Sequence, residues 1–399
     1  MAIGTINGIR SNDNKFQIEL RQSFGKVSKG AGPAFYFNSP SDGEIYAVSS
    51  NPDIASIQGY IHHMPNTSID GAIIVSANNY GSAVIYIGQA AGTGDYADKT
   101  PEVVAVYVQV MPSVGDTLNT TSWSVISEVA QLGIGDQYWS IGDTKEITLN
   151  GTIGTLALDN FNCKVFILHF NYPINNVADN NIIFGGFKHD DYTDDIALAD
   201  SKYNSSSSDG TLYFNMMHWG QYNYGGWKGC DFRYDILGAT STPPSDYGYA
   251  NDMTREGYDA TSATLTNPKE NTLLAALPND FRNRLRLWSR WIDAVGGSSN
   301  IEENIEETVD AVTLLTEFEV AGSRNNANQY EQNHQSQMDY YRLGNSKTRC
   351  RHNSSSWSGW WFASPYAGGP WYFTSINGAG GLRVDMCNNS ECIAPAFKI

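Results

Sequence analysis

The sequence has few charged residues and no long apolar run. Only 17% of its 399 residues are Asp, Glu, Lys or Arg. No window approaches the roughly 20 apolar residues that a membrane-spanning helix needs, so we expect no membrane insertion. The net charge is −17, so nucleic acid is not an expected partner. The first residues also lack the basic and apolar segments of a secretory signal.

Cysteine is scarce and odd in number. Five cysteines cannot form a pure disulfide framework. Cys387 and Cys392 are separated by four residues and have no second pair at zinc-ligand spacing. We therefore predict free, buried thiols in a protein made in a reducing cytoplasm.

Catalytic and metal-binding patterns are missing as well. No HExxH motif, phosphate-binding loop or Ser-His-Asp pattern is found, so we predict neither an enzyme nor a cofactor. The carboxylates between Asp190 and Asp200 could bind calcium or serve a glycosidase. They lack the spacing of an EF-hand loop, and we favour a solvated acidic loop and no metal site.

The chain is instead rich in residues of turns and β-structure. It contains 38 Gly and 23 Tyr, and 12% of the residues are aromatic. Its length suits two or three domains. This composition predicts a loop-rich, β-rich multi-domain protein with ample material for a core.

The N-terminal third shows the pattern of a β-sandwich. Residues 1–13 are polar and read as an arm. Residues 14–112 carry short alternating runs, such as 34–37 and 103–110, separated by turn residues. The stretch Ser49–Ile57 resembles bacterial immunoglobulin-like group 2 domains, which implies an immunoglobulin-like spacer domain.

Residues 113–132 read as a connector that contains a short helix. Thr121 or Ser122 can cap the segment 122–132, and Gly133 can end it. The apolar residues at helical spacing are expected to dock on a neighbouring domain or subunit. They are Trp123, Ile126, Val129 and Ala130.

Residues 133–399 predict an α+β domain. We expect a buried strand at 164–170, helices at 231–237 and 270–276, and a strand at 311–315. A longer helix is predicted over 279–292 from four apolar residues at 4-3-4 spacing. These residues are Phe281, Leu285, Trp288 and Ile292.

The C-terminal tail, residues 357–399, changes character along its length. Its ends are apolar and fixed by proline, and we expect Trp361, Pro365, Pro395 and Phe397 to be buried scaffold. The middle of the tail is rich in Tyr, Ser, Gly and Asn, the composition of a recognition surface. The tail therefore predicts a binding face supported by a fixed core.

An ordered set of motifs carries a family resemblance over roughly the last two-thirds of the chain. Trp360-Trp361-x-x-Ser364-Pro365 is followed by the closing Ala394-Pro395-Ala396-Phe397. Upstream lie Gly225–Arg233 and Leu314–Val320. The set resembles the C-type-lectin-like domains of phage surface proteins, in particular the variable proteins of diversity-generating retroelements.

This resemblance implies the fold and the function. Residues 133–399 would form a C-type-lectin-like domain of a virion surface protein, either a tail fibre or a capsid decoration. The protein would bind a host cell-surface protein or glycan, contact other virion proteins and form a homotrimer. The expected ligand-binding residues share one solvent-accessible and possibly variable face. They are Arg351, Asn353, Trp371, Phe373, Ser375, Asn377, Arg383, Asp385, Asn388 and Asn389.

Two other functions fit parts of the sequence. The lectin-like domain could be a purely structural virion component. Formylglycine-generating enzymes share the fold and need a reactive cysteine pair, a role in which Cys387 and Cys392 could be cast. The surroundings of these two cysteines do not resemble that enzyme motif. The Glu-Pro-Asn and Trp-Asn-Asp signatures of calcium-dependent lectins are missing too.

Overall fold

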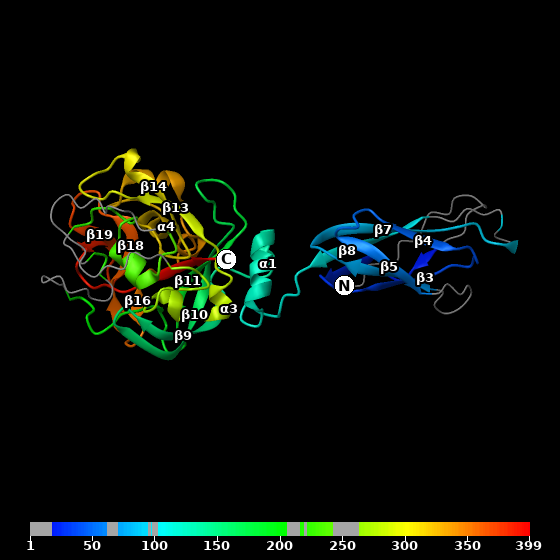
Figure 1. Cartoon of the computed structure of the whole chain (residues 1–399), viewed down its shortest axis with the longest axis horizontal. Helices are drawn as coiled ribbons and strands as arrows, with labels where there is room; N and C mark the ends of the chain where they lie inside the picture. The colour runs from blue at the N-terminus through cyan, green and yellow to red at the C-terminus, as the bar shows by residue number, and fades with distance from the viewer. Residues whose placement is uncertain are drawn as a thin grey trace. The chain divides into compact units, whose positions relative to one another are not determined.

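The computed structural model describes residues 18–61, 71–94, 97, 103–205, 216–218, 222–241 and 263–399. The chain divides into two compact units, residues 1–113 and 114–399 (Figure 1). The expected arm at 1–13 lies outside the described residues. Strands dominate both units, which confirms the β-rich multi-domain prediction. No helix in the described ranges is long and apolar enough to cross a membrane.

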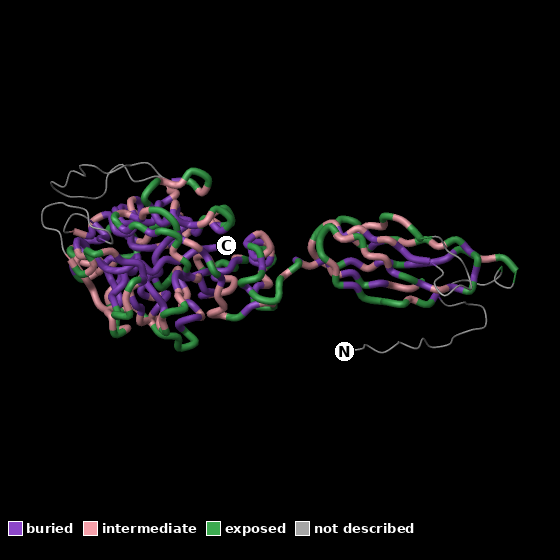
Figure 2. Tube along the Cα trace, turned by 90° about the horizontal axis from the view of Figure 1, so that it is seen from below, coloured by how far each residue is buried: buried purple, intermediate pink, exposed green. Residues whose placement is uncertain are grey.

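The first unit consists of two four-stranded sheets that share one core. Along the strands, buried residues alternate with exposed or partly exposed ones. Figure 2 draws the buried segments of this unit in purple and the exposed ones in green. The core contains Phe35, Ile73, Ile85 and Val108, all at most 3% exposed. One sheet has the order β1 (Glu19–Leu20), β3 (Ala34–Asn38), β6 (Gly71–Ala77), β5 (Ala55–Ile61). The other has the order β2 (Phe24–Ser28), β8 (Val104–Met111), β7 (Gly81–Gln89), β4 (Ile45–Ser49).

The second unit is built around a five-stranded sheet. Its strands come from both ends of the unit, because the last strand of the chain, β21, pairs with β11 on one side and β15 on the other. The C-terminal tail is therefore an integral part of this unit, and the strand expected at 311–315 is present. The order is β15 (Val312–Leu314), β21 (Pro395–Lys398), β11 (Ile182–Lys188), β10 (Leu156–Phe170), β9 (Thr144–Ile153).

Helix α1 (Trp123–Leu132) forms where it was predicted. The Ser122 side chain accepts a hydrogen bond from the amide of Val125, and Gly133 ends the helix with a φ of 70°. Trp123 stacks on Phe281 with ring centroids 4.2 Å apart. The apolar face of the helix is thus buried within the second unit. Trp123, Ile126, Val129 and Ala130 belong to that unit's core.

Three smaller sheets and several short helices complete the second unit. The sheets have the orders β12-β16-β17, β13-β14 and β18-β19-β20. Their strands are β12 (Asp195–Ala197), β16 (Arg349–Arg351), β17 (Trp357–Ser358), β13 (Trp288–Asp293), β14 (Ile305–Asp310), β18 (Trp360–Pro365), β19 (Tyr372–Ile376) and β20 (Leu382–Met386). The helices are η2 (Gly135–Gln137), η3 (Arg233–Leu237), α2 (Leu273–Ala276), α3 (Asn279–Arg282), η4 (Glu302–Asn304), α4 (Glu317–Ala321), η5 (Gln329–His334) and α5 (Asp339–Arg342).

The helix predicted over 279–292 is wrong. Helix α3 ends at Arg282, and Trp288 begins strand β13, which pairs antiparallel with β14. Phe281, Leu285, Trp288 and Ile292 are all buried as expected, but two of them belong to a strand. Residues 270–276 likewise give only the single turn of α2.

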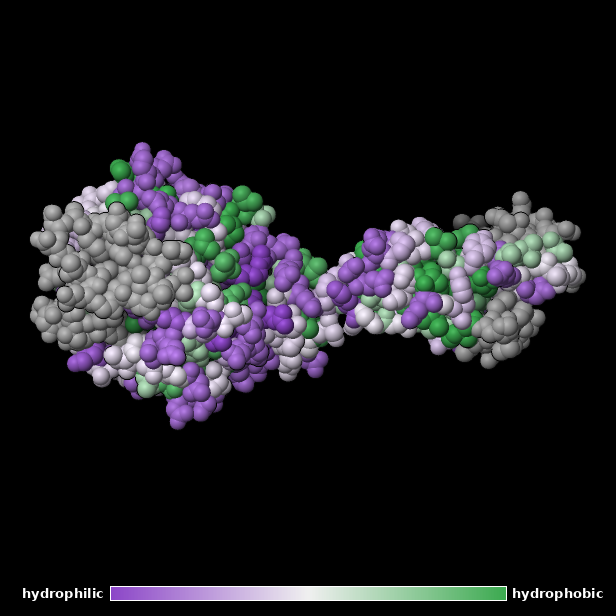
Figure 3. All heavy atoms as spheres, in the orientation of Figure 1, coloured by the Kyte–Doolittle hydropathy of each residue, from purple (hydrophilic) through white to green (hydrophobic). Residues whose placement is uncertain are grey.

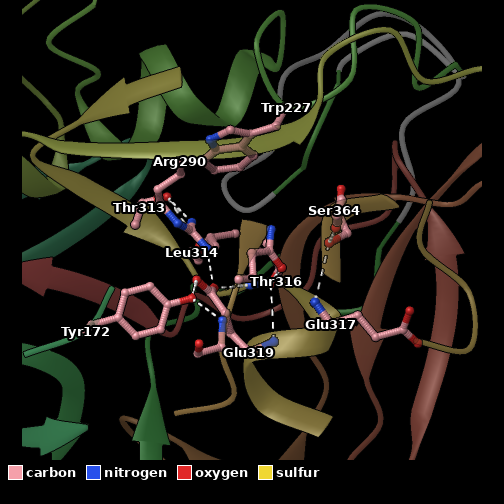
Figure 4. A network of polar contacts seen from close by, with 12 residues as sticks. Tyr172, Trp227, Arg290, Thr313, Leu314, Thr316, Glu317, Glu319 and Ser364 are labelled. Atoms are coloured by element: carbon pink, nitrogen blue, oxygen red, sulfur yellow. Dashed lines mark hydrogen bonds and ion pairs between the residues drawn. The ribbon is translucent and has the colours of Figure 1, made fainter. Parts of the chain in front are cut away.

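A buried ion pair explains why the strand prevails over the helix. Arg290, which points inward between Trp288 and Ile292 on β13, pairs with Glu319 of α4. Their side chains are 2% and 1% exposed. Figure 4 shows Tyr172, Arg290 and Thr316 converging on the Glu319 carboxylate. The Tyr172 hydroxyl and the Thr316 amide each donate to it over 2.8 Å.

Candidate ligand-binding face

The two ends of the tail are scaffold, as predicted. Trp361 and Phe397 are fully buried, and Pro365 and Pro395 are buried within β18 and β21. Phe397 packs against Phe281 with ring centroids 5.3 Å apart. The tail thus enters and leaves the core at fixed points, and the hairpin β19–β20 lies between them.

Three of the predicted contact residues are not accessible. Phe373 and Ser375 lie on β19, the middle strand of its sheet, and both are 0% exposed. Asn388 is 3% exposed. Side chains of a strand point to the two faces of its sheet, and both faces of β19 are covered: Phe373 packs in one core cluster and Ile376 in the other. The expectation that Phe373, Ser375 and Asn388 contact a ligand is therefore wrong for this structure.

Five aromatic residues gather beside this hairpin, and we call them the aromatic cluster. Trp371 is 44% exposed, and the other four are partly buried. Two come from residues 222–224 and three from residues 366–372. Ring centroids are 5.3 to 6.5 Å apart between successive neighbours. In order along the cluster, the residues are Tyr224, Tyr222, Trp371, Tyr372 and Tyr366.

Asn223 fixes these two segments to each other. It is 0% exposed, and its side-chain amide donates to the carbonyl oxygen of Tyr372 over 2.7 Å. Its backbone amide donates to the carbonyl oxygen of Pro370 over 2.6 Å. The Asn223 side-chain oxygen accepts from the amide of Gly297 over 2.8 Å. The backbones that carry the aromatic cluster are thus held by buried hydrogen bonds.

A chain of buried polar groups connects this anchor to β18. The Ser364 hydroxyl donates to Glu331 over 2.6 Å, and the other oxygen of that carboxyl accepts from the Asp293 amide over 3.0 Å. The Asp293 carboxylate accepts a hydrogen bond from the amide of Gly296. The next residue, Gly297, is the one whose amide binds the Asn223 side chain. Burial raises the pKa of both acids, and that of Glu331 reaches about 8. The loops under the aromatic cluster therefore rest on a rigid polar support.

This support should make stability depend on pH. An unfolded Glu titrates near pH 4.3, so between about pH 4.3 and 8 the native state retains a proton that the unfolded state has lost. The free energy of unfolding should fall as pH rises through this window, by up to about 1.4 kcal/mol per pH unit. Glu331→Gln cannot ionise and can still meet Ser364 and the Asp293 amide, so its profile should be flatter. Urea titrations from pH 5 to 8 measure both profiles. Parallel profiles would contradict the assignment.

The predicted residues Arg383, Asp385 and Asn389 form a second group with Glu391. Arg383 pairs with Asp385 over 2.5 Å and also contacts Glu391, which is fully buried. The Asn389 amide donates to Asp385. Burial raises the pKa of Glu391 to about 8, with Asp385 adding to the effect and Arg383 opposing it. Asp385 pairs with Phe373 across the hairpin, so this group lies near the end of the hairpin where Trp371 precedes β19.

The remaining predicted residues are placed differently. Asn353 is exposed, and the Arg351 guanidinium lies 5.2 Å from the ring centre of Tyr203. Asn377 shapes the turn between β19 and β20, because its side-chain oxygen accepts from the amides of Ala379 and Gly381. Of the ten predicted residues, the structure therefore brings Arg383, Asp385 and Asn389 into direct contact. Trp371 joins an aromatic group that the sequence analysis did not assemble.

The cysteines do not form a reactive pair. All five are free and buried. Burial raises the pKa of the Cys387 and Cys392 thiols well above the usual range, which keeps them protonated and poorly nucleophilic. Within the described ranges, no three His, Cys, Asp or Glu side chains gather in a way that could hold a metal ion.

A hollow of about 310 Å³ is lined by residues of α1, β9 and α3 and the loop after α3. Lys145 at its edge is already engaged, because its ammonium donates to the carbonyl oxygens of Asn119 and Thr121 over 2.9 and 2.7 Å. It therefore anchors the loop that leads into α1, a structural role.

Comparisons with known proteins give no family. No family model matches the chain, and no curated protein does. Among solved structures, domains 4 and 5 of the S-layer protein SbsC align with 23% of this chain and 50% of theirs, at 19% identity and a TM-score of 0.17. Domains 5–6 of SbsC align with 38% of this chain and 59% of theirs, at 14% identity and a TM-score of 0.18. A longer SbsC structure aligns over 22% of its length at a TM-score of 0.20. At these scores the alignments support neither a shared fold nor a shared function.

Proposed function

We propose that this protein is a phage virion surface protein that binds a host cell-surface receptor through the aromatic cluster and the adjoining Arg383–Asp385 group. In this proposal the first unit is an immunoglobulin-like spacer, and the second is a C-type-lectin-like domain. The tail motifs that resemble variable proteins of diversity-generating retroelements support that assignment, and so does the burial of their apolar residues. The protein would sit on a tail fibre or capsid and would carry no cofactor.

The observation that carries the proposal is a partly exposed aromatic surface on a rigid base. Tyr and Trp provide large contact areas at low conformational-entropy cost. Exposed aromatic side chains on free loops would have to be ordered upon binding. Here the buried hydrogen bonds of Asn223 have already fixed both segments. A preorganised surface of this kind suits recognition, because little entropy is lost when the ligand arrives.

Trp371→Ala should weaken binding without unfolding the protein. Loss of a central aromatic anchor costs about 2 kcal/mol or more of binding free energy, roughly a thirtyfold loss of affinity. An exposed substitution shifts stability by only about 0.5 kcal/mol. Fluorescently labelled protein would be titrated against a panel of intact bacterial cells, and the best-bound strain used for affinities.

Trp357→Ala is the matched control. Trp357 is 60% exposed and lies outside the aromatic cluster, on β17. Its loss should leave cell binding unchanged. Equal effects of the two substitutions, or no binding to any cell by the wild-type protein, would favour a purely structural virion component.

A further inference from the structure

The outer surface of one sheet in the first unit is unusually apolar. Strands β2, β8, β7 and β4 each direct large side chains away from the core, and their register places these side chains side by side. Phe24 is opposite Tyr107, and Tyr86 is opposite Val48. We call this surface the outer apolar face. Its large members are Phe24, Tyr46, Val48, Tyr86 and Tyr107, with exposed fractions of 46 to 61%.

The rest of the face is small, apolar or neutral. Val84 is opposite Tyr107, and Ala105 is opposite Tyr86. The Tyr46 ring occupies the space above Gly88, where an added Cβ would be 2.5 Å from the ring. Among these paired outward positions one side chain is charged, that of Lys26 in the middle of β2, opposite Gln109 on β8. Hydrophobic residues also form patches on this unit's surface in the space-filling view (Figure 3).

We propose that the outer apolar face is a self-association surface, on which a second copy of this chain packs sheet against sheet about a twofold axis. The chain carries a net charge of −17, so contact between two copies is opposed by repulsion over much of the surface. The outer apolar face contains no carboxylate among its paired outward positions, and the exposed Glu44 precedes β4 at its margin, so the repulsion is weakest over this face.

The area of the face fits such a contact. An aromatic side chain has about 150–250 Å² of surface, so four half-exposed rings and a valine present roughly 450 Å². Two copies would bury roughly 900 Å² in the apolar centre alone. A stable interface buries about 1,200–2,000 Å² in total, and the difference is the usual share of a polar rim.

The order of the strands also suits a twofold contact. Tyr107 and Tyr86 lie on the two central strands, β8 and β7, whereas Phe24 and Val48 lie on the edge strands. A twofold axis parallel to the strands places β8 of one copy over β7 of its partner. The tyrosines of both copies then meet at the centre, where contacts contribute most to affinity.

Tyr86→Lys tests the proposal in the full-length protein. A lysine at the centre would be buried without a partner in both copies. We expect sedimentation velocity to show that the mass of the wild-type species is halved in the variant, or that its dissociation constant rises at least about tenfold. Val48→Lys on the edge strand is a second variant if Tyr86→Lys lowers the melting temperature.

Tyr36→Lys is the matched control. Tyr36 is a 39% exposed tyrosine on β3, in the other sheet of the same unit, so it should leave the association unchanged. A wild-type monomer at concentrations up to about 100 µM would overturn the proposal. An oligomer that both Tyr86→Lys and Val48→Lys leave intact would overturn it equally. Cell binding through the second unit is measured separately and does not enter this test.

Discussion

Replacing Glu319 with alanine should lower the free energy of unfolding by about 3–5 kcal/mol. Glu319 is the partner of Arg290, and both side chains are almost fully buried. Without the carboxylate, the Arg290 guanidinium remains in the core with no opposite charge, and the hydroxyl of Tyr172 loses its acceptor. The capping interaction of Glu319 with the Thr316 amide, which begins α4, is lost as well. Chemical denaturation followed by circular dichroism measures the change.

Glu306→Ala provides the comparison for this prediction. Glu306 pairs with Lys228 on the surface, and their side chains are 45% and 41% exposed. An exposed ion pair contributes about 0–1 kcal/mol, so its removal should be barely measurable. If Glu319→Ala proved as mild as Glu306→Ala, the ion pair between Arg290 and Glu319 would not exist in solution as described.

Phe397→Ala should destabilise the second unit by about 3–5 kcal/mol. Phe397 is fully buried on β21, opposite Phe184 on β11 and Val312 on β15, and its ring packs against Phe281. Removing the ring leaves a cavity where two neighbouring strands and α3 meet. Thermal melts and denaturant titrations of the purified variant give the loss.

Thermal melts of Trp371→Ala test whether the middle of the tail is exposed while its ends are core. Trp371 is 44% exposed, so its loss should change stability by only about 0.5 kcal/mol. A loss for Trp371→Ala as large as that for Phe397→Ala would mean that the middle of the tail is core. The receptor-binding proposal would then lose its support.

Local patterns predicted the features that local physics determines. Helix α1 begins at its serine cap and ends at its glycine as the sequence indicated, because capping and helical spacing involve neighbouring residues. The buried ends of the tail were also predictable, since Trp361, Pro365, Pro395 and Phe397 stand in apolar surroundings.

The error at 279–292 has a specific cause. Phe281, Leu285, Trp288 and Ile292 fit a helix, but Trp288, Arg290 and Ile292 also alternate as in a strand. The strand pattern is invisible if Arg290 is taken as a solvent-exposed charge. Glu319, 29 residues further along the chain, makes its burial possible. The apolar periodicity of a short window of sequence cannot reveal a partner that lies so far along the chain.

The candidate face was only partly predictable for the same reason. Trp371 was singled out from composition, but Tyr222 and Tyr224 are about 150 residues away in sequence and reach it only through the fold. Phe373 and Ser375 were expected on the surface because small polar and aromatic residues surround them. Their burial follows from the packing of other elements on the face of the sheet that carries them, which composition does not encode.

The position of β21 in the main sheet affects how the protein is made. Strands β9, β10 and β11 leave the ribosome more than 190 residues before Pro395–Lys398, yet β21 must enter between β11 and β15 before the sheet is complete. Contacts between such distant segments slow folding. The edge of β11 must wait unpaired during synthesis, when exposed strand edges are prone to aggregation. Nascent chains that stop short of residue 395 cannot close this sheet, so the cell's proteases can distinguish them from finished molecules.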